Sequence, residues 1–202
     1  YRKRIRETKI EKDPIFILGH WRSGTTYLQN VLSRDEQFGW FDPVNTIGLP
    51  YSLLLGRLIQ PPIEKGIQNG RPQDNVQYSL DLPMEETFGV LTISPYSIIH
   101  MIAFPENYKK YIEGAFVSDL PVEELRKWER SYDYAVRKLT YIKKGKQLIL
   151  KSPDNTARIR ELAIKEHGYA PLLILQATHS GRYSKPHGKP EPLTAYPLLS
   201  WE

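Results

Sequence analysis

The chain has 202 residues, of which 40% are hydrophobic, enough for one domain with its own core. It contains no cysteine, which excludes disulfide bonds and thiolate metal sites, and the spacing of its histidines predicts no metal site. No run of about 18 apolar residues occurs, so the sequence predicts no membrane span and no stable insertion into a membrane. The formal net charge of +5 suits an anionic ligand that carries several charges.

Basic residues are concentrated in residues 1–13, which we interpret as a solvated helix or arm before the first strand. Such an arm can bind nucleic acid, but no nucleic-acid-binding motif accompanies it, so no nucleic-acid partner is predicted. The chain begins with Tyr1 rather than methionine, and we expect that a leader is missing. A cytoplasmic location is therefore only the default expectation.

The first predicted strand, residues 14–18, leads through a glycine-bracketed loop into a helix predicted over residues 23–33. This order is typical of a phosphate cradle, in which backbone N–H groups and a helix N-terminus face an anion. Gly19 and Gly24 have the spacing of a nucleotide phosphate loop, but Thr25 occupies the position where such a loop carries lysine. The positive charge lies on Arg22 instead, which argues against an ordinary kinase or ATPase. A plain glycine turn with hydroxyl caps would explain Ser23 or Thr25 alone, but not the whole stretch.

The middle of the chain is predicted to be mostly helix and loop. The leucines of residues 53–59 predict a short helix that ends at Pro61-Pro62, followed by a loop over residues 66–83 and a helix over residues 85–104. A longer helix is predicted over residues 121–143, with Ser118 or Asp119 as its cap and Gly145 at its end. Apolar residues recur along it at three- and four-residue steps, and we interpret this stripe as core packing: Leu125, Trp128, Tyr132, Ala135, Leu139 and Ile142.

A second buried strand is predicted at residues 147–151, followed by a helix over residues 157–167. In an open α/β sheet, ligands lie beyond the carboxyl ends of the strands. Arg22 and Lys151 both follow such ends, so we expect the fold to bring them to one crevice. The alternative for Lys151 is a plain exposed lysine after a strand.

Two motifs resemble those of the sulfotransferases that use 3′-phosphoadenosine-5′-phosphosulfate (PAPS). Arg22-Ser23-Gly24-Thr25-Thr26 is similar to the 5′-phosphosulfate loop of the family, and Leu150-Lys151-Ser152-Pro153 is similar to its strand-end lysine motif. The resemblance covers residues 14–167 and implies an α/β P-loop nucleotide-binding fold with a central parallel sheet flanked by helices. It implies PAPS as co-substrate and no metal. It also implies that Arg22, Ser23, Gly24, Thr25 and Thr26 bind this co-substrate and that Arg22 and Lys151 take part in catalysis.

The implied reaction moves a sulfonate group to a hydroxyl or amine of a small-molecule, carbohydrate or lipid acceptor by in-line displacement. A hydroxyl acceptor needs a general base. The cytosolic branch of the family has a histidine where this chain has Pro153. Glu85 and Glu86 resemble the acidic cluster of the bacterial-type members and are the preferred candidates, although a solvated helix start would also explain them. Asp42, Asp154 and His100 remain open.

The resemblance ends after residue 167. The family's next strand ends in an arginine, with a serine about eight residues later, and the pair holds the 3′-phosphate. Here the run at residues 172–175 has no such arginine, Arg182 comes late, and Pro190 occupies the serine position. Residues 168–202 form an atypical tail rich in proline and glycine. We expect a chain that is truncated or altered at its C-terminus, with an incomplete fold.

Three functions follow from these patterns. The first is a PAPS-dependent sulfotransferase. The second is a catalytically dead or truncated nucleotide-binding relative of the same fold, and the third is a divergent P-loop kinase. The sequence does not define the acceptor pocket. Four tyrosines would either line this pocket or pack in the core: Tyr51, Tyr78, Tyr96 and Tyr108.

Overall fold

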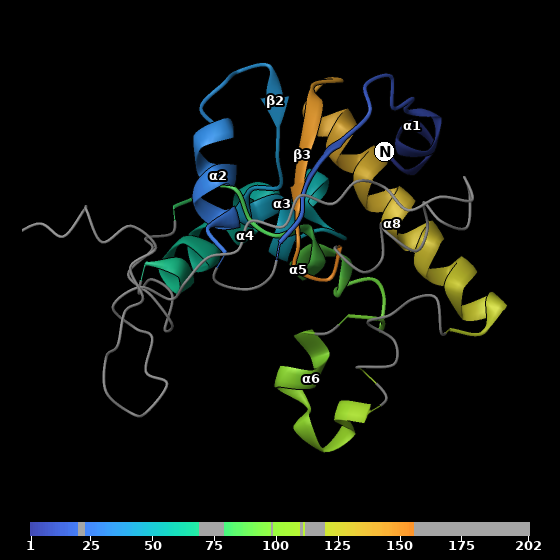
Figure 1. The fold of residues 1–202 in the computed structure, drawn as a ribbon. Helices are drawn as coiled ribbons and strands as arrows, with labels where there is room; N and C mark the ends of the chain where they lie inside the picture. Colours follow the sequence, from blue (N-terminus) through green and yellow to red (C-terminus); the bar gives the residue numbers. More distant parts are fainter. Residues whose placement is uncertain (20–22, 69–78, 98, 110, 112–119, 156–202) are drawn as a thin grey trace, which may run out of the picture.

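The computed structural model describes residues 1–19, 23–68, 79–97, 99–109, 111 and 120–155 (Figure 1). In this part of the chain, three parallel strands form one sheet in the order β1-β3-β2: β1 (Ile15–Ile17), β2 (Phe38–Gly39) and β3 (Gln147–Lys151). The predicted α/β class and parallel sheet are confirmed, and so are the two predicted strands. Strand β2 has no counterpart among the predicted strands, because two residues are too few to show a strand pattern.

The central strand β3 is covered on both faces. Successive side chains of a strand point to opposite faces. Leu148 and Leu150 belong to the same buried cluster as Leu139 of helix α8 (Val122–Ile142). Lys151 lies on the opposite face and reaches Thr26 at the start of helix α2 (Thr25–Leu32). Figure 1 shows α2 and α8 on opposite sides of β3.

Helices α2 and α8 agree with the predicted segments. The N-cap of α8 is Pro121, and the predicted caps Ser118 and Asp119 lie outside the described residues. Gly145 follows the end of α8 with a φ of 74°, as expected for a glycine that ends a helix.

The basic N-terminus contains helix α1 (Arg2–Glu7), which packs against α8. Ile5 of α1 is only 2% exposed, so one apolar side chain fixes a helix whose other side chains are mostly exposed. Whether residues 1–13 form a unit separate from residues 14–167 stays a prediction.

The helix predicted to end at Pro61-Pro62 does not end there. Helix α4 (Ser52–Ile67) continues through both prolines. A proline removes one helical N–H and leaves a carbonyl group without its donor. Because α4 has no buried residue, solvent can satisfy these carbonyl groups. The loop predicted over residues 66–83 begins too early, because α4 runs to Ile67; residues 79–83 form turn and irregular structure, and residues 69–78 lie outside the described residues.

The single helix predicted over residues 85–104 is wrong. Two short helices, α5 (Glu86–Val90) and α6 (Ile99–Ala103), occupy this segment. Pro95 lies between them and disfavours continuous helix. A 3-10 turn, η1 (Pro105–Asn107), follows α6, and helix α3 (Pro43–Ile47) packs against both α4 and α5.

The described helices include none that is long and apolar enough to cross a membrane. The helix predicted at residues 157–167 and the tail at residues 168–202 lie outside the described residues. The same holds for the positions where the family's arginine and serine are missing, including Arg182 and Pro190.

The buried ammonium of Lys138 is expected to make the protein more stable as the pH rises. Lys138 on α8 is 1% exposed, and its Nζ donates a hydrogen bond to the carbonyl of Leu49. Burial lowers its pKa from 10.5 to about 8. Between these two values the unfolded chain binds more protons than the folded chain, so the free energy of unfolding rises with pH.

Urea unfolding across this pH window checks the prediction. The wild type is expected to gain stability with pH relative to Lys138→Met, in which the titrating group is absent. Parallel pH profiles for the two proteins would contradict the assignment.

Candidate active site

The ends of the predicted phosphosulfate loop have the expected geometry. Gly24 is the N-cap residue of α2 and adopts a φ of 81°, a conformation that favours glycine. A Cβ atom at Gly19 would lie 2.6 Å from the Oγ of Ser23 and from the Cγ2 of Thr25, so a larger residue there would force these side chains to move. The Ser23 side chain is buried, and Thr25 and Thr26 are half-buried at the first turn of α2. His20, Trp21 and the predicted catalytic residue Arg22 lie outside the described residues.

Lys151 connects this loop to the end of β3. Its side chain is 5% exposed, and its Nζ donates a 3.2 Å hydrogen bond to Thr26 Oγ1. The same ammonium forms an ion pair with the carboxylate of Glu85. The structure therefore brings together one residue from each of the two motifs and one of the two glutamates. These residues are 125 and 66 positions from Lys151 in the sequence. The alternative of a plain exposed lysine is wrong.

Glu86 lies in a different environment from Glu85. It is 1% exposed, and its carboxylate accepts hydrogen bonds from the backbone N–H of Lys151 at 2.8 Å and from the Tyr132 hydroxyl at 3.2 Å. The side-chain amide of Asn155 also donates to it. Burial raises the pKa of Glu86, although the hydrogen bond from Asn155 opposes this effect. Glu86 thus fixes the end of β3 to α5 and α8, whereas Glu85 contacts the ammonium of Lys151.

The sequence analysis did not select Tyr132 and Asn155 for this site. Tyr132 was assigned to the apolar stripe of the long helix, and it does pack against the core cluster. Its ring also stacks on Trp128 at 5.2 Å, while its hydroxyl reaches Glu86. A polar atom at the end of a core side chain gives no separate signal in the hydrophobic periodicity. Asn155 stands four residues after Lys151, and its position next to a strand end, directly after the strand-end lysine motif, was the available signal.

Thr87 joins α5 to the loop that follows β3. Its backbone N–H donates to Ser152 Oγ at 3.1 Å, and its hydroxyl donates to Asp154 Oδ2 at 3.1 Å. The Thr87 hydroxyl also lies 3.1 Å from Ser97 Oγ. Asp154, one of the open candidates for the general base, therefore contributes to the support of the loop.

The two other open candidates lie elsewhere. Asp42 caps α3 by accepting the N–H of Asn45 at 2.9 Å, and it forms a 3.0 Å ion pair with Lys143. His100 lies in α6 and stacks on Tyr111 with ring centroids 5.3 Å apart. Neither residue has a described contact with Lys151. The helix cap and the ion pair are enough to explain why an aspartate occupies position 42.

The predicted aromatic pocket is not assembled in the described part of the chain. Tyr51 precedes α4 and is 60% exposed, and Tyr108 is 48% exposed after η1. Tyr96 donates its hydroxyl to Glu124 of α8, and this hydrogen bond raises the pKa of Tyr96 to about 12. Tyr78 lies outside the described residues. Within the described ranges, no group of three or more histidine, aspartate or glutamate side chains is arranged to hold a metal ion.

The parallel sheet with a glycine-bracketed loop between its first strand and the following helix defines an α/β protein, and comparison with known proteins makes the class more specific. Residues 14–78 match the model of the sulfotransferase family. The chain belongs to this family. It is similar to the omega-hydroxy-beta-dihydromenaquinone-9 sulfotransferase Stf3 of Mycobacterium bovis and to its counterpart in Mycobacterium tuberculosis.

The similarity to each of these two proteins is 32% identity over 160 residues, which is 79% of this chain and 41% of the relative. The chain thus spans about two fifths of the length of these curated relatives. No solved structure gives a significant match.

Proposed function

We propose that this chain carries the PAPS-binding part of a sulfotransferase and transfers a sulfonate group from PAPS to an acceptor hydroxyl. The observation that carries the proposal is the contact of Lys151 Nζ with Thr26 and Glu85, because it unites both family motifs at one strand end. In this proposal the loop from Gly19 to Thr26 holds the 5′-phosphosulfate through its backbone N–H groups and Arg22.

The reaction is a displacement at sulfur. The acceptor oxygen forms a bond to sulfur while the bond between sulfur and the bridging oxygen breaks, and adenosine-3′,5′-bisphosphate leaves. In this proposal Lys151 stabilises the negative charge that develops on the leaving side, and its burial supports the role because such an interaction is strong in a buried site. Glu85 is proposed to take the acceptor proton, and while paired it holds the Lys151 ammonium in position.

An apolar acceptor that bears a hydroxyl is the preferred class. The two curated relatives are named for an omega-hydroxy menaquinone, a molecule of this kind. Their name supports the acceptor class and does not specify the acceptor of this chain.

Calorimetric titration with adenosine-3′,5′-bisphosphate, with ATP as the competing ligand, tests the proposal. We expect the bisphosphate to bind more tightly than ATP, and we expect turnover with PAPS and a hydroxylated lipid acceptor. Preferential binding of ATP would favour the divergent kinase. Bisphosphate binding without turnover would favour the inactive nucleotide-binding relative.

The left-handed conformation of Gly24 gives a prediction that does not depend on turnover. Gly24→Ala places a Cβ on a residue with a φ of 81° at the entry of α2, which costs about 1–2 kcal/mol if the loop keeps its shape. We expect the affinity for the bisphosphate to fall by about tenfold. Gly66→Ala is the matched control, because Gly66 lies inside α4 with nothing within 4 Å of an added Cβ. Equal affinities of the two variants would contradict a role of this loop in binding.

A further inference from the structure

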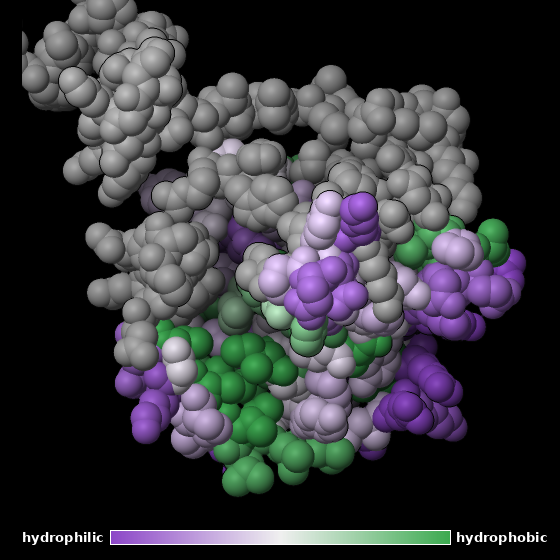
Figure 2. All heavy atoms as spheres, turned by 90° about the horizontal axis from the view of Figure 1, so that it is seen from below, coloured by the Kyte–Doolittle hydropathy of each residue, from purple (hydrophilic) through white to green (hydrophobic). Residues whose placement is uncertain are grey.

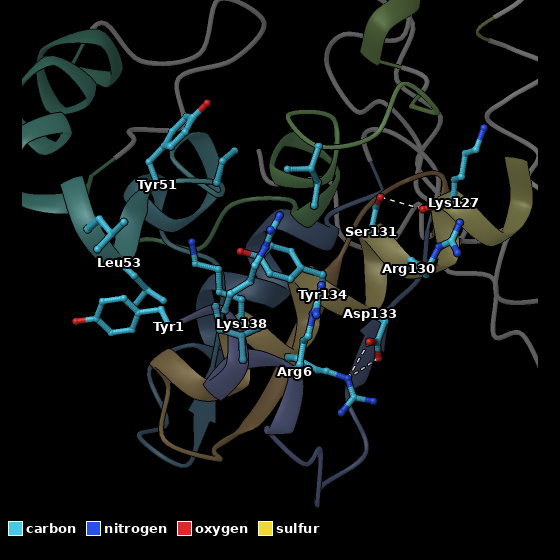
Figure 3. Close-up of a pocket in the computed structure, with 16 residues that line it drawn as sticks. Tyr1, Arg6, Tyr51, Leu53, Lys127, Arg130, Ser131, Asp133, Tyr134 and Lys138 are labelled. Atoms are coloured by element: carbon cyan, nitrogen blue, oxygen red, sulfur yellow. Dashed lines mark hydrogen bonds and ion pairs between the residues drawn. The ribbon is translucent and has the colours of Figure 1, made fainter.

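A groove of about 780 Å³ lies between α1, the start of α4 and α8 (Figure 3). We call it the basic groove. In Figure 3, Tyr1, Tyr51 and Leu53 line one side, Lys127 and Arg130 line the other, and Lys138 lies between them. None of Thr26, Glu85, Glu86 and Lys151 lines it, so the basic groove is separate from the candidate active site.

The lining is strongly cationic. One carboxylate, Asp133, lines the groove together with six cationic side chains: Arg2, Arg6, Lys127, Arg130, Arg137 and Lys138. The excess of five positive charges equals the formal net charge of the whole chain. Asp133 pairs with Arg137 at 2.8 Å, and Lys127 pairs with Glu124 at 2.8 Å. No carboxylate of the described residues pairs with Arg2, Arg6 or Arg130.

The burial of Lys138 makes the excess of positive charge in the groove energetically unfavourable. Its ammonium is buried and has the carbonyl oxygen of Leu49 as its described partner, with no described carboxylate nearby to balance it. A buried cation without a counter-ion loses hydration that one carbonyl does not replace. The low pKa of Lys138, about 8, reflects this burial. A bound anion would supply the missing opposite charge.

The groove also has an apolar part that continues onto the surface. Ile5, Leu53 and Ile93 line it. Leu54 of α4 also lines the groove and is 75% exposed, and Leu58, one turn further along α4, is 72% exposed. Figure 2 shows a patch of hydrophobic side chains on the face seen from below. Cations beside exposed leucines of one helix are typical of a surface that meets a lipid interface.

We propose that the basic groove binds the headgroup of an anionic phospholipid, with the exposed leucines of α4 in contact with its acyl chains. The occupant follows from charge complementarity: the headgroup balances Arg6, Arg130 and Lys138, and the acyl chains cover Leu54 and Leu58. An inorganic anion would satisfy the cations and leave the leucines in water. This site would hold the protein at a membrane surface without any spanning helix.

Co-sedimentation with phospholipid vesicles tests the proposal. We expect binding to vesicles in which about one third of the phosphatidylcholine is replaced by phosphatidylglycerol, weaker binding at high salt, and little binding to phosphatidylcholine alone. Arg6→Ala/Arg130→Ala removes two exposed cations of the groove, and vesicle affinity is expected to fall by about 30-fold. Lys12→Ala/Lys146→Ala removes two exposed cations outside the groove and should change the affinity much less. Leu54→Ser/Leu58→Ser should weaken vesicle binding as well.

Three results would overturn the proposal. One is an equal loss of vesicle affinity in both double cation variants, which would indicate attraction to net charge alone. Another is full competition by inorganic phosphate together with unchanged binding by the leucine variant, which would indicate a site for a free anion. The third is a dimer that is lost in Leu54→Ser/Leu58→Ser without any vesicle binding, which would assign the surface to a second copy of the chain. The bisphosphate titration is measured on the same variants and is expected to stay unchanged, so failure of this proposal is distinguishable from failure of the proposed function.

Discussion

Lys151→Met is expected to lower the rate of sulfonate transfer by about 10²–10³-fold, the size of effect seen when one preorganised donor to a developing negative charge is removed. The ammonium of Lys151 is buried at the end of β3 and is oriented by Thr26 and Glu85. Methionine keeps most of the side-chain volume and removes the charge. Because the interaction strengthens as the leaving group develops charge, we expect the loss to fall mainly on kcat.

Steady-state kinetics with PAPS, together with calorimetric titration of the bisphosphate, separates catalysis from binding. Lys146→Met is the matched control, because Lys146 is an exposed lysine just before the same strand. A loss of bisphosphate affinity that accounts for the whole effect would move Lys151 from catalysis to binding. An unchanged rate would remove it from the site.

Substitution of Glu85 is expected to lower mainly turnover, whereas substitution of Glu86 is expected to lower mainly the stability of the fold. Glu85→Gln keeps an acceptor oxygen for Lys151 but cannot take a proton, so turnover should fall by about 10²–10⁴-fold with a small change in stability. Glu86→Ala removes the carboxylate that accepts from two buried donors, the N–H of Lys151 and the amide of Asn155, and from the half-buried hydroxyl of Tyr132. We expect it to lower the free energy of unfolding by about 3 kcal/mol or more.

Urea unfolding and turnover, measured on both variants, check this division. Thr92→Ala is a useful control, because Thr92 lies just after the same helix and its described side-chain hydrogen bond goes to the nearby carbonyl of Gly89 at 2.6 Å. If Glu86→Ala remains as stable as the wild type while turnover is lost, Glu86 rather than Glu85 would be the better candidate for the base.

The direction in which stability changes with pH provides another test of Glu86. Burial raises its pKa above that of the unfolded chain, so the folded protein holds this proton to higher pH. Its contribution to stability is therefore complete below the unfolded value of 4.5 and is lost as the pH rises through the folded value. The trend is opposite in direction to that of Lys138, whose effect appears only in the alkaline range.

Several features of this protein were readable from the sequence because they depend on neighbouring residues. The glycine spacing around Arg22 and the apolar run before it predict a strand, a loop and a helix. The strand and helix are confirmed, and Gly24 has the conformation that only glycine adopts easily. The periodicity of residues 121–143 likewise predicts α8 closely, because one apolar stripe along so many turns leaves little choice of structure.

Other features required the tertiary structure. The short strand β2 exists because β3 offers it a hydrogen-bonding edge, and two residues have no pattern of their own. Continuation of α4 through Pro61 and Pro62 depends on the exposure of that helix, which no local sequence records. The ion pair of Asp42 joins it to Lys143, which is 101 positions away in the sequence.

The candidate active site shows the same division. The residue types can be read directly from the chain: a glycine-bracketed loop with an arginine, a strand-end lysine and two adjacent glutamates. That Glu85 faces Lys151 while Glu86 is buried beneath the strand end follows from the packing of distant segments. Adjacent residues at the start of a helix point in different directions, and which direction leads to the ammonium is fixed by the packing of α5 between β3 and α8.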